Sequence, residues 1–177
     1  TGVASGFGKL GKFGMEQKAV SVCGDSTFFH SVMPALVNAV HVQSDMMLVV
    51  FDNRGTAMTG FQPHPGTEND AMGNVVNAID IESICRAIGA DVYVADPFDL
   101  SSTTEKVLDL VENKTGATVL IMKQSCALSP EKKGKKNYEM SVDESKCRGE
   151  NCGCNRFCTK VFRCPGLVWN REKGVSM

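Results

Sequence analysis

Short apolar runs alternate along the chain with longer segments in which apolar side chains recur at helical spacing. The runs have the length of buried strands, and the longer segments have the pattern of amphipathic helices. Strands are expected at residues 18–23, 46–51, 91–95 and 117–122. Helices are expected at residues 27–41, 79–88 and 101–114. This alternation indicates an α/β fold, with a parallel sheet covered by helices on both faces and joined by right-handed crossovers.

The connection after the second predicted strand is unusually long. Residues 54–74 form a polar stretch rich in Gly, Thr and Pro. A loop of this length inside a domain is usually functional. We therefore expect residues of a binding or catalytic site within it.

The 177 residues suffice for one ordinary domain with a small appendage. We expect a domain at residues 1–128 that is incomplete at its N-terminus, because there is no initiator Met and residues 1–14 read as a helix already under way. The chain is therefore expected to be a fragment of a longer one. The lysine-rich residues 129–146 are expected to form a solvated linker, with a docking patch for an acidic partner as the alternative. Residues 147–177 form a cysteine-rich segment.

Composition narrows the class of protein. Hydrophobic residues make up 42% of the chain, charged residues 22%, and the net charge is -1. These values are typical of soluble globular proteins and give no indication of nucleic-acid binding. The chain lacks a signal segment, and its apolar runs are far shorter than the roughly 20 residues that cross a bilayer. We expect a cytoplasmic protein without membrane contact.

Two polar signatures follow the first two predicted strands: GDS at residues 24–26 and DNRG at residues 52–55. Ligands bind at the carboxyl ends of parallel strands, and a glycine before a helix start lets backbone N–H groups approach a phosphate. Magnesium needs few protein oxygens when phosphate and water supply the others. Asp25 and Asn53, 28 positions apart, can supply two of them, and the Gly55 carbonyl a third. Two turn-forming residues are the alternative interpretation.

The spacing of Asp25 and Asn53 resembles the motif of thiamine-diphosphate enzymes. The surrounding sequences, GDSTFFHS at residues 24–31 and FDNRGTAMTGFQPHPGT at residues 51–67, make the resemblance more specific. They resemble the thiamine-diphosphate subunit of indolepyruvate:ferredoxin oxidoreductases, within the 2-oxoacid:ferredoxin oxidoreductase superfamily. The match spans most of residues 18–127, which implies the thiamine-diphosphate-binding fold for that part of the chain.

The resemblance assigns roles at both signatures. It implies a magnesium ion held by Asp25, Asn53 and the Gly55 carbonyl. Met58 stands where related pyruvate:ferredoxin oxidoreductases have an Asn, which favours a more apolar substrate pocket. Contacts with the cofactor are implied for Gly24, Asp25, Ser26, Thr27, Asn53, Gly55, Thr56, Ala57, Met58 and Thr59.

Two histidines lie near the same expected edge of the sheet. His30 would sit one turn into the helix that starts at the first signature, and His64 lies in the long loop. Because histidine titrates near neutral pH, both are candidate catalytic residues, in substrate binding or proton transfer. A packing or capping role is the alternative for each.

The eight cysteines are distributed unevenly. Cys23, Cys85 and Cys126 are isolated, and we expect them to be small buried residues. The other five crowd near the C-terminus: Cys147, Cys152, Cys154, Cys158 and Cys164.

The cysteine-rich segment resembles ferredoxins, in which closely spaced cysteines ending in Cys-Pro bind a [4Fe-4S] cluster. A single cluster needs four thiolates. The preferred set is Cys147, Cys158, Cys164 and one of Cys152 or Cys154. Zinc is the alternative, whereas disulfides would require an oxidising compartment.

The resemblance also implies an activity. It is the oxidative decarboxylation of a 2-oxoacid, such as indolepyruvate, to an acyl-coenzyme A, with electrons passing through iron-sulfur clusters to ferredoxin. The Glu that activates thiamine would come from a missing segment or a second subunit of a hetero-oligomer, so this chain alone would be inactive. The alternatives are a non-oxidative thiamine-dependent decarboxylase or carboligase, and a non-catalytic electron-transfer or scaffold subunit.

Overall fold

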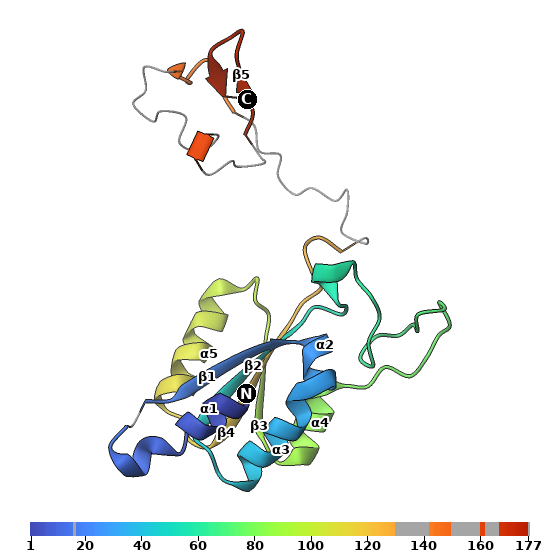
Figure 1. The fold of residues 1–177 in the computed structure, drawn as a ribbon, viewed down its shortest axis with the longest axis vertical. Helices are drawn as coiled ribbons and strands as arrows, with labels where there is room; N and C mark the ends of the chain where they lie inside the picture. Colours follow the sequence, from blue (N-terminus) through green and yellow to red (C-terminus); the bar gives the residue numbers. More distant parts are fainter. Residues whose placement is uncertain (16, 130–141, 150–159, 162–166, 177) are drawn as a thin grey trace. The chain divides into compact units, whose positions relative to one another are not determined.

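Four parallel strands form the central sheet, in the order β1-β2-β4-β3 (Figure 1). They are β1 (Ala19–Gly24), β2 (Met46–Asp52), β3 (Asp91–Ala95) and β4 (Ala117–Lys123). Each coincides with a predicted strand to within one residue at either end. The predicted parallel sheet is therefore confirmed, and β1 and β2 are neighbours in it.

The computed structural model describes residues 1–15, 17–129, 142–149, 160–161 and 167–176. The chain divides into two compact units, Thr1–Lys133 and Gly134–Met177. The larger unit contains the four-stranded sheet. Within the smaller unit, the short strands β5 (Trp169–Asn170) and β6 (Val175–Ser176) pair antiparallel. Most of the predicted linker and four of the five clustered cysteines lie outside the described residues.

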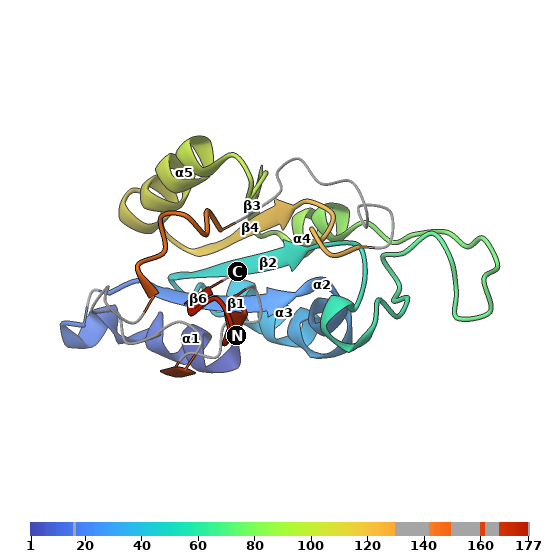
Figure 2. The same ribbon diagram turned by 90° about the horizontal axis from the view of Figure 1, so that it is seen from above.

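Helices cover both faces of the sheet, as predicted. Residues of α1 (Gly2–Phe7), α3 (Met33–His41) and α4 (Ile81–Ile88) pack on one face. α5 (Leu100–Glu112) packs on the other face, and Figure 2 shows it on the opposite side of the strands from α3. Helices on both sides of the central strands β2 and β4 explain why these two sequences carry continuous apolar runs rather than alternating ones, whereas β1 leaves Val20 and Val22 exposed. The helical turn expected at the N-terminus is α1, followed by a 3₁₀ turn (Leu10–Phe13).

The helix that follows β1 departs from a regular α-helix. α2 (Asp25–Thr27), a π-helical turn (Phe28–Val32) and α3 follow one another without a break. Pro34, near the start of α3, has no N–H and would clash with the carbonyl four residues earlier in a regular α-helix. The wider π turn accommodates this proline, and such turns are frequent at functional sites.

The isolated cysteines of the larger unit behave largely as predicted. Cys23 and Cys85 are buried, and Cys126 is half buried. Burial raises the pKa of the Cys23 thiol to about 11 and that of Cys85 to about 12. Both thiols are therefore protonated at neutral pH, as expected for small core residues rather than nucleophiles.

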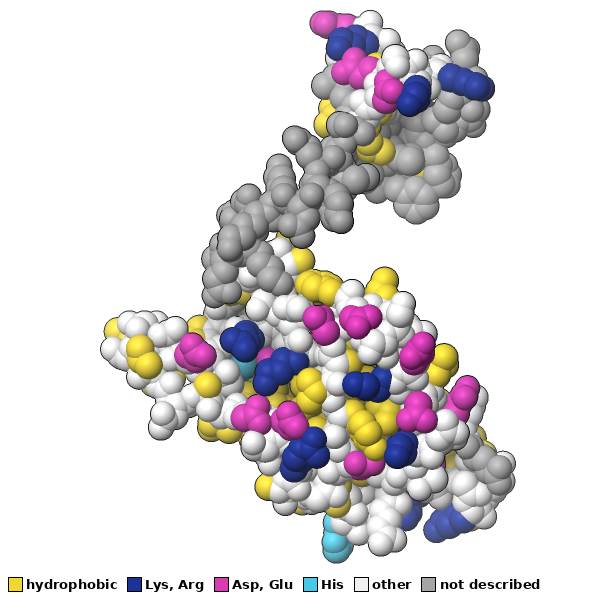
Figure 3. All heavy atoms as spheres, turned by 180° about the vertical axis from the view of Figure 1, so that it is seen from behind, with side chains coloured by type: hydrophobic (Ala, Val, Ile, Leu, Met, Phe, Trp, Pro, Cys, Tyr) yellow, Lys and Arg dark blue, Asp and Glu magenta, His cyan; other side chains and the backbone are white. Residues whose placement is uncertain are grey.

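Charges of both signs are mixed over the face seen in Figure 3, where Lys and Arg side chains lie among Asp and Glu side chains. Such mixing matches the small net charge of the chain. Within the described residues, none of the helices combines the length and the apolar character that a membrane span requires.

Candidate cofactor and metal site

The two polar signatures meet at the carboxyl edge of the sheet. Gly24 at the end of β1 pairs in register with Phe51 near the end of β2. Asp25 begins α2, directly beyond β1, and Asn53 directly follows β2. These two residues therefore lie at adjacent strand ends, at the carboxyl edge where the sequence analysis expects a ligand.

The Asp25 carboxylate connects the two strand ends. Its Oδ2 accepts hydrogen bonds from the backbone N–H groups of Asn53, at 3.1 Å, and Gly55, at 3.2 Å. Its Oδ1 accepts from the N–H of Ser26 at 2.8 Å. Asp25 is only 2% exposed. A buried carboxyl group held by three backbone donors has a fixed orientation.

The backbone at Arg54 explains how two N–H groups reach one oxygen. Arg54 has φ 63°, in the left-handed region that non-glycine residues seldom adopt. This conformation reverses the chain between Asn53 and Gly55, so both of their N–H groups point at Asp25. Strained backbone of this kind is concentrated at functional sites.

Asn53 offers an unused oxygen beside Asp25. Its Oδ1 is buried and, among the described residues, has no hydrogen-bond partner. A buried polar atom without a partner costs free energy unless a ligand or ion satisfies it. The described residues contain no group of three or more His, Cys, Asp or Glu that could hold a metal ion. A site built from one carboxylate, one amide oxygen and one backbone carbonyl contains a single residue of these four types and so does not form such a group. Its oxygen donors suit magnesium.

His64 is brought against Asp25 from the long loop. Its side chain is 1% exposed, and Nε2 lies 3.1 Å from Asp25 Oδ2. Nε2 nevertheless counts among the buried atoms without a hydrogen-bond partner in the described part of the chain. The contact between Nε2 and Oδ2 is therefore electrostatic, and the Nε2–H is not aligned with a lone pair of Asp25.

His30 lies elsewhere, on the π turn after α2. It is exposed, and its Nδ1 is 2.6 Å from the Ser26 carbonyl oxygen. Because a carbonyl can only accept, Nδ1 carries the proton and Nε2 is the acceptor of the neutral ring. Ser26 is half buried and Thr27 exposed at the same helix start.

The first part of the long loop is a tight hairpin. Thr56 pairs with Gln62 around a 3₁₀ turn (Ala57–Thr59). The Gln62 side chain donates to the Thr59 carbonyl at 2.7 Å and accepts from the Thr59 hydroxyl at 2.6 Å. Met58, at the tip, is 100% exposed. The hairpin thus presents a fully exposed apolar side chain on a well-braced turn.

One further carboxylate lies near the site. Burial, followed by the charge of Asp25, raises the pKa of Asp52 at the end of β2. Ionisation of the Asp52 carboxyl group therefore costs more free energy in the folded protein than in water. Asp52 was not among the residues expected to bind the cofactor.

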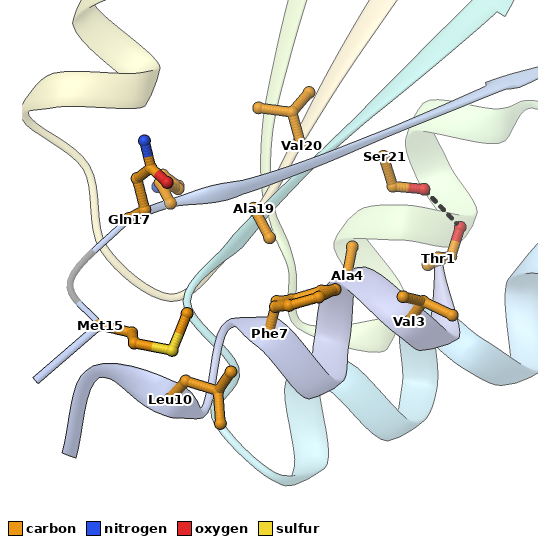
Figure 4. A pocket seen from close by; sticks show the side chains of 11 residues that line it. Thr1, Val3, Ala4, Phe7, Leu10, Met15, Gln17, Ala19, Val20 and Ser21 are labelled. Atoms are coloured by element: carbon orange, nitrogen blue, oxygen red, sulfur yellow. Dashed lines mark hydrogen bonds between the residues drawn. The ribbon is translucent and has the colours of Figure 1, made fainter. Parts of the chain in front are cut away.

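Two cavities of similar size lie in different parts of the larger unit. One, of about 460 Å³, lies between α1 and the start of β1, with Val3, Phe7 and Ala19 among its lining residues (Figure 4). The other, of about 410 Å³, is lined at the carboxyl edge by Asn53, Thr67 and other residues. Since ligands of parallel sheets bind at the carboxyl edge, the second cavity is the one connected with the site.

Comparison with known families agrees with this geometry. A family described as "Thiamine pyrophosphate enzyme, C-terminal TPP binding domain" matches residues 1–122. The chain belongs to the thiamine pyrophosphate enzymes. The family match covers both polar signatures and the four strands of the sheet except the last residue of β4.

Two proteins similar to this chain are named "Indolepyruvate oxidoreductase subunit IorA". The chain from Pyrococcus horikoshii is 40% identical over 92% of this chain and 25% of its own length. That from Methanothermobacter thermautotrophicus is 42% identical over 86% of this chain and 24% of its own. The present chain thus spans about a quarter of the length of these curated relatives.

A solved structure, benzoylformate decarboxylase from Polynucleobacter necessarius, is more distant. It is 18% identical and covers 66% of this chain and 21% of its own, with a TM-score of 0.47. A likeness of this size adds nothing to the assignment.

Proposed function

We propose that this chain carries the magnesium and thiamine diphosphate half-site of a 2-oxoacid oxidoreductase that acts on indolepyruvate or a related arylpyruvate. The observation that carries the proposal is the buried Asn53 Oδ1, which lacks a partner among the described residues and belongs to a residue whose backbone N–H donates to the buried Asp25 carboxylate. The names of the relatives support the substrate class.

The chain's own residues divide the binding between them. Asp25, Asn53 and the Gly55 carbonyl hold the magnesium ion, because they offer oxygen donors at one edge of the sheet. Bound thiamine diphosphate would supply the carbanion chemistry that decarboxylates a 2-oxoacid, with the cofactor as acceptor of the electrons left by carbon dioxide. The residues that contact it are Gly24, Ser26, Thr27, Thr56, Ala57, Met58 and Thr59.

Two exposed side chains face the substrate in this proposal. Met58 contributes apolar surface, which suits an aromatic 2-oxoacid. His30 is the candidate proton-transfer residue, since its Nδ1–H is held by the Ser26 carbonyl and its Nε2 is left as a base.

The electrons leave through the smaller unit. Four of the five clustered cysteines would hold a [4Fe-4S] cluster, which would supply one-electron transfer to ferredoxin, and coenzyme A would accept the acyl group. Cys147 is the one of these five cysteines that lies within the described residues. Its free thiol is half buried, and its sulfur accepts a hydrogen bond from the Ser176 N–H at 3.4 Å. Hydrogen bonds to sulfur are one means of tuning cluster potentials. A second subunit completes the enzyme.

Replacement of Asn53 tests the magnesium site. In the complete enzyme, Asn53→Ala should weaken magnesium-dependent binding of thiamine diphosphate about ten- to hundredfold, because an interaction with a charged group contributes about 1.5–3 kcal/mol. Isothermal titration calorimetry at several magnesium concentrations measures this. Asn38→Ala, at an exposed position of α3, is the matched control and should bind normally. Unchanged binding in Asn53→Ala, with the fold intact, would favour the scaffold alternative.

Metal analysis tests the electron-transfer part separately. Protein purified without oxygen should contain iron and acid-labile sulfide in nearly equal amounts, about four of each per chain. Its broad visible absorption should bleach when an arylpyruvate and coenzyme A are added in the presence of the second subunit. Zinc without iron would contradict the cluster and leave a non-oxidative thiamine enzyme.

A further inference from the structure

His64 is enclosed by three different elements. The Phe29 ring lies on one side, with ring centroids 5.6 Å apart and planes tilted by 33°. Gly66 packs close to both rings, because a Cβ placed there would lie 3.0 Å from both His64 Cε1 and Phe29 Cε2. The Asp25 carboxylate lies at the third, inner side. A ring enclosed in this way has no direct access to a substrate in solvent.

The loop fixes which nitrogen of His64 carries the proton. The backbone N–H of Gly66 donates to Nδ1 at 3.0 Å, so Nδ1 is an acceptor and the proton of the neutral ring is on Nε2. Thr67 holds the backbone of His64 as well, since its hydroxyl accepts from the His64 N–H and donates to the His64 carbonyl. Nε2–H is thereby directed to the side of the ring where Asp25 lies.

The two oxygens of Asp25 have different surroundings. Oδ2 already accepts from the N–H groups of Asn53 and Gly55, which occupy its two lone pairs. The Nε2–H of His64 is a third donor at the same oxygen, which explains why it approaches to 3.1 Å without the alignment of a hydrogen bond. Oδ1 accepts only from the Ser26 N–H among the described residues, which leaves its second lone pair for a cation.

We propose that His64 is a positioning residue: the electrostatic contact of its Nε2–H with Oδ2 keeps the Asp25 carboxylate in an orientation that would leave Oδ1 to a magnesium ion, and it thereby ties the long loop to the metal site. The inference rests on the proposed function, in which Asp25 is a magnesium ligand. Partners that orient a metal-binding side chain typically change metal affinity ten- to hundredfold when they are removed. His64 therefore acts through Asp25 rather than on the substrate.

Two substitutions separate the functions of the two ring nitrogens. His64→Gln retains an N–H donor at the distance of Nε2, whereas His64→Asn retains only an acceptor near the position of Nδ1. In the complete enzyme, His64→Asn should weaken magnesium-dependent thiamine diphosphate binding about tenfold, and His64→Gln should stay within about threefold of the wild type. Calorimetric titration, with manganese binding followed by electron paramagnetic resonance, measures both affinities. His41→Asn, at the exposed end of α3, is the matched control.

The outcomes distinguish this inference from the proposed function. Equal weakening in both His64 variants would overturn it, because packing rather than a donor would then matter. Normal metal and cofactor binding in His64→Asn with reduced turnover would also overturn it, in favour of proton transfer by His64. If Asn53→Ala weakens binding while His64→Asn does not, this inference alone fails. If Asn53→Ala binds normally, the proposed magnesium site fails first.

Discussion

Asp25→Asn should abolish measurable magnesium-dependent thiamine diphosphate binding and also destabilise the free protein. The variant loses the only carboxylate of the proposed metal site. In either orientation of the amide, its NH₂ group faces a backbone N–H: that of Ser26, or those of Asn53 and Gly55. A buried donor left facing another donor costs about 1–3 kcal/mol. Calorimetric titration and urea unfolding of the complete enzyme measure the two effects.

Asp52→Asn is the matched control, because Asp52 ends the neighbouring strand. Burial and the charge of Asp25 raise the pKa of Asp52 in the folded protein. Its contribution to stability is therefore present at low pH, below the unfolded pKa, and is lost as the pH rises through the folded pKa. The control should bind cofactor normally and be more stable than the wild type at neutral pH, with no advantage in acid. Equal loss of binding in both variants would show that Asp25 has no special position.

The two central strands, β2 and β4, could be predicted from the sequence because they are buried on both faces. The run from Met46 to Phe51 is continuously apolar, and it became β2, between β1 and β4. The order of the strands in the sheet could not be predicted from such runs, because an apolar run can occupy any position in a sheet that is covered on both faces. The π turn at Phe28–Val32 was not predicted either. Pro34 was its signal, three residues after Ser31 in a segment otherwise typical of a regular helix.

The placement of Asp25 and Asn53 at the same edge of the sheet was also predictable, because the carboxyl ends of parallel strands lie at one edge. The contact of His64 with Asp25 was not, since it depends on the path of a loop without periodicity. His64, Pro65 and Gly66 do carry a local signal: a glycine two residues after a histidine permits the close packing against Phe29. For the clustered cysteines other than Cys147, which lie outside the described residues, the predicted iron-sulfur site rests on their spacing in the sequence alone.

Phe28→Ala should produce the largest loss of stability among single substitutions near the site. The Phe28 side chain is 0% exposed and packs edge-on against Phe29, with ring centroids 5.6 Å apart. Removal of a buried phenylalanine ring typically costs about 3–5 kcal/mol. Urea unfolding followed by circular dichroism measures the change in the free energy of unfolding.

Phe13→Ala is the control for the size of this effect. Phe13 is 71% exposed, and its ring contacts the Lys12 ammonium at 5.1 Å from the centroid. An exposed cation–π contact contributes about 0.5–1 kcal/mol, so the control should lose no more than that. A similar loss in both variants would contradict the assignment of Phe28 to the core.

Because Phe28 follows α2 directly and Phe29 touches His64, a cavity there should also loosen Asp25 and weaken cofactor binding. Stability and binding are therefore expected to fall together in Phe28→Ala, whereas Asn53→Ala should lower binding alone.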